Sequence, residues 1–171
     1  MKKLLCVLLG VLMILPAFAF SGCGQAETLT FGLGVYTNVT ATSDATEDKD
    51  GQGKVAITAA AVTVDAAGKI VACVLDTADI TVKYTAAGKA VANDGFKTKY
   101  EQGTEYNMVA YGGAAKEWFE QADAFNGLCV GKTATEIAAL VASDNYGTAD
   151  VKAAGCTILV NGLVKAAVKI G

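Results

Sequence analysis

The chain is poor in the side chains that most enzymes use for catalysis. It contains no histidine and no arginine, and serine occurs only at positions 21, 43 and 143. A Ser/His/Asp triad needs an imidazole to move the proton, zinc hydrolases use imidazole ligands, and guanidinium groups are preferred for clamping phosphate. The carboxylates of Glu101, Glu105 and Glu117 are present, but no spacing fixes two of them at working distance. The composition therefore favours a binding protein over an enzyme.

Cysteine is the remaining reactive side chain, at positions 6, 23, 73, 129 and 156. Cys73, Cys129 and Cys156 each lie in an apolar stretch, which is typical of thiols buried as small hydrophobic side chains. Two alternatives remain: a single disulfide that leaves one thiol spare, and a three-cysteine metal site. The lack of any CxxC spacing argues against the metal site.

A connection rich in tyrosine and glycine is the candidate binding site. Its aromatic faces, its backbone N–H groups and the start of the helix expected after it could together receive a small planar or anionic ligand. The candidate residues are Tyr106, Tyr111, Gly112, Gly113, Ala114 and Trp118. In the alternative interpretation the tyrosines pack on their own loop, and Trp118, which falls at helical spacing, anchors its helix in the core.

The elements that must position this connection are strands followed by helices. Residues 30–42, 54–64 and 69–75 are rich in β-branched side chains, and residues 80–85 alternate between apolar and polar. Asp65–Gly68 is a hairpin turn, residues 43–53 are an acidic loop, and residues 96–101 are a further short strand. Gly32 and Gly34 lack the third glycine of a dinucleotide fingerprint and are interpreted as a bulge.

Helical periodicity begins at Gly113, and Asn126-Gly127 is expected to close the first helix. Thr133 and Glu136 form a capping box that starts a second helix, which runs to about Ala142. Apolar residues from position 159 to 170 recur at helical spacing and predict a third helix. The sequence therefore predicts one α+β domain over residues 30–171, an antiparallel meander of four to five strands with helices packing on it.

The N-terminus has the layout of a secretory signal: Lys2 and Lys3 precede an apolar run over residues 4–20. Residues 20–23, Phe-Ser-Gly-Cys, resemble the lipobox at which bacterial lipoproteins are cut and acylated. We therefore expect residues 1–22 to be a signal peptide, Cys23 to carry lipid, and residues 23–29 to be a short tether. This places the domain on the extracytoplasmic face of the cell membrane. The alternative is an ordinary signal peptide with an incidental cysteine.

The net charge argues against nucleic acid as a partner. Loss of Lys2 and Lys3 with the signal would change the net charge from −3 to −5. Nucleic-acid phosphates require clustered cations, which an acidic domain does not supply.

Four segments of the chain carry a family resemblance: residues 62–70 (VTVDAAGKI), 97–101 (KTKYE), 116–122 (KEWFEQA) and 130–133 (VGKT). With them the chain resembles small lipoproteins of Gram-positive anaerobes that are related to FMN-binding domains. In the flavin-bearing relatives a Ser-Gly-Ala-Thr connection holds FMN through a phosphoester bond to its threonine. This chain has Gly112-Gly113-Ala114-Ala115 at the matching place, and Ala115 has no hydroxyl group to accept the bond.

The resemblance therefore implies a module without covalent flavin, which binds FMN or another aromatic molecule reversibly or binds nothing. The expected function is non-catalytic binding of a small planar or anionic ligand by a membrane-anchored lipoprotein. The alternatives are a structural lipoprotein that recognises another envelope protein, or an accessory protein of extracellular electron transfer with non-covalent flavin.

Overall fold

The structure is a computed structural model that describes residues 28–93 and 95–170. The predicted signal peptide and Cys23, the predicted site of lipidation, lie outside the described residues. Among the residues that are described, no helix is both long enough and apolar enough to cross a membrane.

An antiparallel sheet with strand order β1-β2-β3-β4 forms the base of the domain. Its strands are β1 (Thr30–Ser43), β2 (Gly51–Val64), β3 (Ile70–Tyr84) and β4 (Ala90–Val91). Each of the first three is joined to the next by a short connection, which confirms the predicted meander. The turn between β2 and β3 is also as predicted: the Asp65 carboxylate accepts hydrogen bonds from the backbone N–H groups of Ala67 and Lys69, and Gly68 has a φ of 73°.

Two predictions about the strands were wrong. The runs at 69–75 and 80–85 are a single strand, because residues 76–79 stay paired with β2. Residues 96–101 do not form a strand, since Lys99–Gln102 is the helix α1. Thr98 and Glu101 form a capping box that starts this helix, the same device that Thr133 and Glu136 supply further along the chain.

The helical layer consists of short elements after the sheet. They are α1, the 3₁₀ turn η1 (Gly103–Tyr106), α2 (Trp118–Cys129), α3 (Ala134–Ala138), α4 (Ala149–Ala153), α5 (Asn161–Ala167) and the 3₁₀ turn η2 (Val168–Ile170). The start of α3 and the presence of α5 agree with the sequence analysis, whereas α4 was not predicted. Helix α3 is also shorter than expected, because the chain turns after Ala139 and buries Leu140.

Helix α2 begins and ends later than its sequence suggested. It begins at Trp118 rather than near Gly113, because Glu117 is extended and its backbone N–H donates to the Glu120 carboxylate. It continues past Asn126-Gly127 to Cys129, and Asn126 is buried within it, where its amide oxygen accepts a hydrogen bond from the Cys73 thiol. The glycine with positive φ that follows the helix is Gly131, at 78°.

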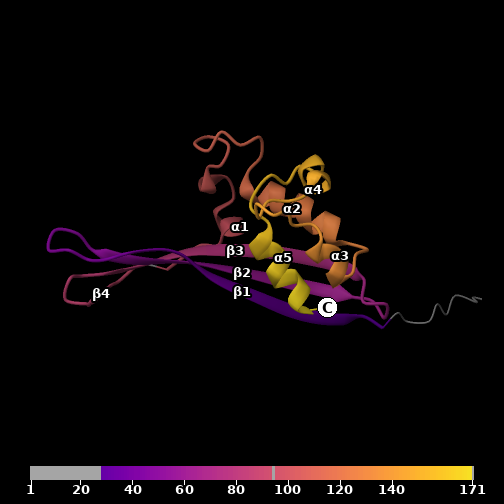
Figure 1. Ribbon diagram of the computed structural model, residues 1–171, viewed down its shortest axis with the longest axis horizontal. Helices are drawn as coiled ribbons and strands as arrows, with labels where there is room; N and C mark the ends of the chain where they lie inside the picture. The colour runs from indigo at the N-terminus through magenta and orange to yellow at the C-terminus, as the bar shows by residue number, and fades with distance from the viewer. Residues whose placement is uncertain (1–27, 94, 171) are drawn as a thin grey trace, which may run out of the picture.

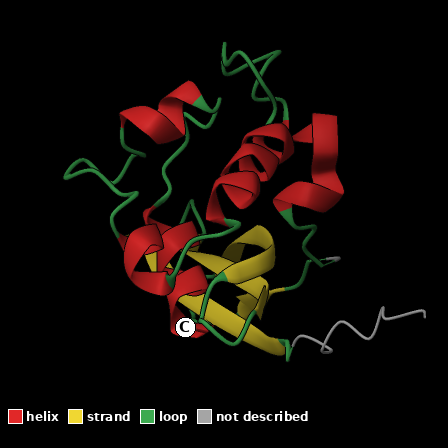
Figure 2. Cartoon of the chain, turned by 90° about the vertical axis from the view of Figure 1, so that its right-hand side faces the viewer, coloured by secondary structure: helices red, strands yellow, loops and turns green. Residues whose placement is uncertain are grey.

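All helices lie on one side of the sheet, as Figure 1 and, from the side, Figure 2 show. The core lies between these layers, where Val62, Leu75 and Cys73 of the sheet meet Phe125 and Leu163 of the helices. The strands run on beyond the helices at one end, on the left in Figure 1, so part of the helix-side face is open there.

Gly32 and Gly34 do not mark a bulge, contrary to the prediction; the pairing of β1 with β2 is continuous there and shifts only between Val39 and Ala41. The glycines instead let α5 and η2 approach β1 closely. A Cβ atom added at Gly34 would lie 2.1 Å from the carbonyl oxygen of Ala166. The missing side chain therefore makes room for the helix backbone.

Candidate ligand-binding pocket

A pocket of about 310 Å³ lies where the helical layer ends on the sheet. Strands β1, β2 and β3 form its floor, and the starts of α1, α2 and α5 form its walls. Its aromatic and aliphatic lining comes from Tyr36, Trp118, Leu159 and Leu163. Small-molecule sites typically begin at about 300 Å³, so this pocket is large enough for a small ligand.

The floor carries two buried hydroxyl groups. Thr58 and Thr77 are 4% and 7% exposed, and their hydroxyl oxygens lie 2.9 Å apart. Each hydroxyl has one proton and two lone pairs, so the bond between them uses only one of the two protons. The other proton and the remaining lone pairs can serve a ligand.

Three asparagines also line the pocket. Asn38 comes from β1, Asn161 from the start of α5, and Asn145 from the loop before α4. Asn145 has a left-handed backbone with a φ of 67°, and its carbonyl oxygen accepts from the backbone N–H groups of Val160 and Asn161. Each amide offers two N–H donors and a carbonyl acceptor, which suits a ligand with a mixed hydrogen-bonding edge.

The lining contains one cation, Lys99, whose charge is already balanced. Its ammonium group lies 3.0 Å from the Asp79 carboxylate, and its side chain is 14% exposed. The same nitrogen lies 5.0 Å from the centroid of Tyr106 and 5.5 Å from that of Trp118, within the range of cation–π attraction. The ion pair and two aromatic rings therefore fix this wall of the pocket and leave it close to neutral.

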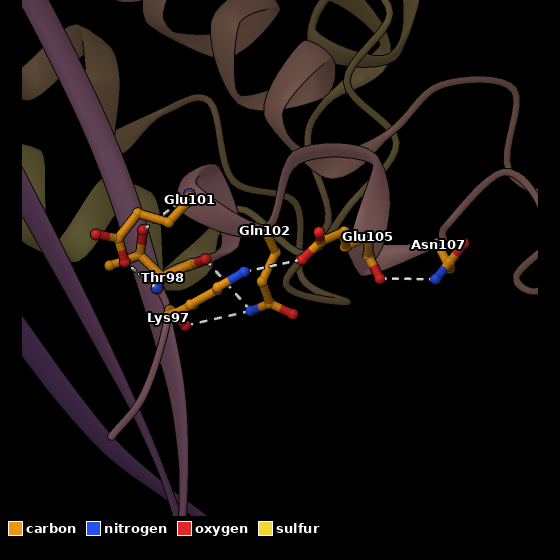
Figure 3. A network of polar contacts seen from close by, with 6 residues as sticks. All are labelled: Lys97, Thr98, Glu101, Gln102, Glu105 and Asn107. Carbon is orange, nitrogen blue, oxygen red and sulfur yellow. Dashed lines mark hydrogen bonds and ion pairs between the residues drawn. The ribbon is translucent and has the colours of Figure 1, made fainter. Parts of the chain in front are cut away.

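A polar network holds the segment that presents Lys99 (Figure 3). Lys97 pairs with Glu105 at 2.9 Å, and the Gln102 amide donates to the carbonyl oxygens of Lys97 and Thr98. The Asn107 amide donates to the carbonyl oxygen of Glu105 at 2.7 Å. These bonds join α1 to η1, so Lys99 and Tyr106 are positioned as one unit.

Tyr100 supports Trp118 from behind the pocket. Its ring meets Trp118 edge-on, with centroids 6.3 Å apart, and its hydroxyl donates to the Asp123 carboxylate. Burial, that hydrogen bond and the charges of Asp123 and Asp76 raise the pKa of Tyr100 to about 12. The phenol therefore stays protonated and keeps donating to Asp123 throughout the physiological range.

The structure separates the residues of the predicted site. Trp118 is 4% exposed and lines the pocket, and Tyr106 reaches its edge through Lys99. The connection through Gly112, Gly113 and Ala114 lies elsewhere: Ala114 donates to the Met108 carbonyl oxygen, and Tyr111 is 88% exposed. None of the residues from 111 to 114 lines the pocket.

The carboxylates considered for catalysis bond to neighbouring parts of the chain. Glu101 caps α1, Glu105 pairs with Lys97, and Glu117 accepts from the backbone N–H groups of Met108 and Val109. Within residues 28–93 and 95–170, no cluster of three or more Cys, Asp or Glu residues is placed to hold a metal ion.

The thiols of Cys73, Cys129 and Cys156 are buried and free, as the first interpretation of their apolar neighbours predicted. A hydrogen bond shared with Cys73, together with burial, places the pKa of Cys129 far above its usual range. Burial also raises the pKa of Cys156. Cys129 and Cys156 are therefore poor nucleophiles in the folded protein, whereas the hydrogen bond with Cys129 lowers the pKa of Cys73.

The hydroxyl and amide groups of the pocket were not predicted from the sequence. One signal was present: Thr58 shares its strand face with Ala60 and Val62, so it is a polar residue at a position that the alternation of β2 marks as buried. Nothing local connects Thr58 to Trp118 or Asn161, which reach the pocket only through the tertiary fold.

Comparison with known proteins adds no relative to this description. The chain matches no family model, no curated protein sequence and no solved structure.

Proposed function

We propose that this protein is a non-catalytic binding module for a small, planar, uncharged ligand, held on the extracytoplasmic face of the membrane by lipid on Cys23. The observation that carries the proposal is the pocket beside Trp118, in which two buried hydroxyl groups and three amide side chains surround a space of about 310 Å³.

The lining favours a flat ring with a polar edge. Tyr36 and Trp118 provide aromatic surface, and Asn38, Asn161 and the hydroxyl of Thr58 provide donors and acceptors. Ligand sites typically combine apolar surface with a few placed polar groups in this way. A heterocycle whose edge alternates carbonyl and N–H groups could satisfy these side chains without carrying charge.

An anionic group finds less support in the same pocket. Lys99 is the one cation of the lining, and Asp79 already balances its charge at 3.0 Å. The phosphate of FMN would therefore bring two negative charges to a wall without a spare positive charge. If the protein binds flavin, recognition would rest on the ring system, and riboflavin would bind at least as tightly as FMN.

Calorimetric titration of the purified full chain in detergent tests the proposal. Riboflavin, FMN, uridine and glucose serve as probes: two planar flavins that differ in charge, a smaller planar heterocycle, and a neutral non-planar ring. Saturable binding of riboflavin or uridine, lost in the variant Thr58→Val, supports the proposal. Binding of FMN alone would contradict the neutral pocket, and no saturable binding of any probe would remove the proposed function.

The lipid anchor is tested separately in cells. Metabolic labelling with a fatty-acid analogue should mark the wild-type chain and leave the variant Cys23→Ser unlabelled. The variant should also leave the membrane fraction. Equal labelling of both chains would rule out Cys23 as the site of acylation.

A further inference from the structure

The face of the sheet opposite the helices is apolar along most of its length. Successive residues of a strand point to opposite faces of the sheet. Gly32 and Gly34 face the helices, so Phe31, Leu33 and Val35 point to the opposite face. The strand register aligns five rows on this outer face: Phe31–Thr63–Ala72, Leu33–Ala61–Val74, Val35–Ala59–Asp76, Thr37–Ile57–Ala78 and Val39–Val55–Ile80. Figure 1 shows the helices only on the other side.

The larger side chains of these rows are well exposed. Phe31 is 70% exposed, Leu33 66%, Val39 62% and Val74 59%. Single exposed apolar residues are ordinary, but a contiguous apolar patch that spans a whole sheet face marks an interaction surface. We call the five rows the outer face.

The outer face approaches the size of a specific interface. Five rows at two residues per row and about 3.4 Å per residue give a length of about 34 Å, and three strands about 4.8 Å apart give a width of about 14 Å. Two such faces together cover about 950 Å², which is close to the lower limit of about 1,000 Å² for a biological interface.

We propose that the outer face binds the outer face of a second copy of this chain, giving a symmetric dimer with two stacked sheets. The five rows contain one charged residue, Asp76, and its carboxylate already accepts from the backbone N–H groups of Thr77 and Tyr100. Two outer faces therefore meet with less like-charge repulsion than two copies of the acidic remainder of the surface would.

The shape of the outer face is self-complementary. A two-fold axis parallel to β2 places β1 of one copy over β3 of the other, so the large Phe31 faces the small Ala72 of its own row in the second copy. Ala59 and Ala61 in the central strand allow the sheets to approach at about 10 Å, the usual spacing of stacked sheets. The dimer leaves the pockets open, because they lie on the opposite faces.

A membrane surface suits the outer face less well. Segments that lie on anionic membranes combine apolar residues with lysine or arginine. None of the residues in the five rows is basic.

Thiol cross-linking of the full chain in the membranes of the expressing cells tests the dimer. The variant Ala59→Cys puts a thiol at the centre of the outer face, and Ala153→Cys puts one on an exposed position of α4 as the matched control. A short bismaleimide should give a product of twice the chain mass with Ala59→Cys and not with Ala153→Cys or the wild type. Monomer only, or a product with another protein, would overturn the proposal.

A second pair of variants separates the interface from folding. Val74 and Val109 are both exposed, at 59% and 45%, so lysine is tolerated at either position in the monomer. In the Ala59→Cys background, Val74→Lys should lower the yield of cross-linked dimer roughly tenfold, since it puts unpaired charges into the interface. Val109→Lys should leave the yield unchanged. Equal yields in the two variants would show that the outer face is not the interface.

Discussion

The hydroxyl oxygens of Thr58 and Thr77 lie 2.9 Å apart at directly paired positions of β2 and β3. Both side chains point to the helix side of the sheet, where the neighbouring pairs are apolar: Ala60 with Leu75, and Val62 with Cys73. Burying the two hydroxyl groups removes them from water, which is unfavourable. The hydrogen bond between them offsets part of this desolvation penalty. This pair is where the core ends and the pocket begins.

Removing both hydroxyls of the pair should cost less stability than the two single removals added together. Thr58→Val leaves the Thr77 hydroxyl without its partner, at a cost of about 1–3 kcal/mol in the free energy of unfolding. The double variant Thr58→Val/Thr77→Val leaves no orphaned hydroxyl, and its loss should be smaller than the sum of the single losses. Urea unfolding of the four chains measures this difference, and strict additivity would contradict the pairing.

The close approach of α5 to β1 should make Gly34 intolerant of side chains. Gly34→Ala would force the Ala166 carbonyl oxygen to move, because the added Cβ would lie 2.1 Å from it. We expect a loss of about 1–3 kcal/mol in the free energy of unfolding, the usual cost of overpacking. Gly53→Ala is the matched control, since its added Cβ meets nothing within 4 Å. Equal stability of the two variants in thermal or urea unfolding would refute this packing.

Tyr100, whose ring packs against Trp118, should lose its phenol proton only at high pH. Its pKa of about 12 lies above the value of about 10 for an unfolded tyrosine. The folded state therefore binds this proton more tightly, and the resulting stabilisation is complete below pH of about 10 and is lost as the pH rises towards 12. Ultraviolet titration should show a late phenolate step that Tyr100→Phe removes. Asp123→Asn should move the step to lower pH; a step unmoved by Asp123→Asn would exclude this partnership.

The thiols of Cys129 and Cys156 should resist alkylation until the protein unfolds. Burial and the bond to Cys73 keep Cys129 in its thiol form, and burial does the same for Cys156, whereas alkylating reagents require the thiolate. Peptide mapping after iodoacetamide treatment should find Cys129 and Cys156 unmodified in the native protein and modified in denaturant. Rapid native labelling at Cys129 would contradict its place in the core.

The α+β layout and the meander follow from the sequence because they depend on local signals. Alternation marks the strands, Asp65 and Gly68 mark a turn, and Thr133 with Glu136 marks the start of α3. Residues 96–101, which were wrongly predicted to be a strand, carry the same capping signal at Thr98 and Glu101. In this segment the cap, and not the strand preference of Phe96 and Tyr100, decides the local structure.

The pocket could not be predicted in the same way because its residues meet only through tertiary packing. Thr58 on β2, Trp118 at the start of α2 and Asn161 at the start of α5 are far apart in the chain, and each has a local environment typical of an ordinary strand or helix. The aromatic signal at Trp118 was visible in the sequence. The polar residues that line the pocket with it, such as Thr58 and Asn161, could not be connected to it from the sequence.

Trp118 is the only tryptophan of the chain, so its fluorescence reports directly on the pocket that it lines. A Cβ added at Gly162 would lie 3.3 Å from Oγ1 of Thr58 and 3.8 Å from Cδ1 of Tyr36, so Gly162→Leu should fill the pocket. Gly127→Leu is the control, since its added Cβ meets nothing within 4 Å. Titration with riboflavin or uridine should change the emission of the wild type and of Gly127→Leu saturably, and leave Gly162→Leu unchanged; an equal response from all three would place the ligand outside the pocket and contradict the account.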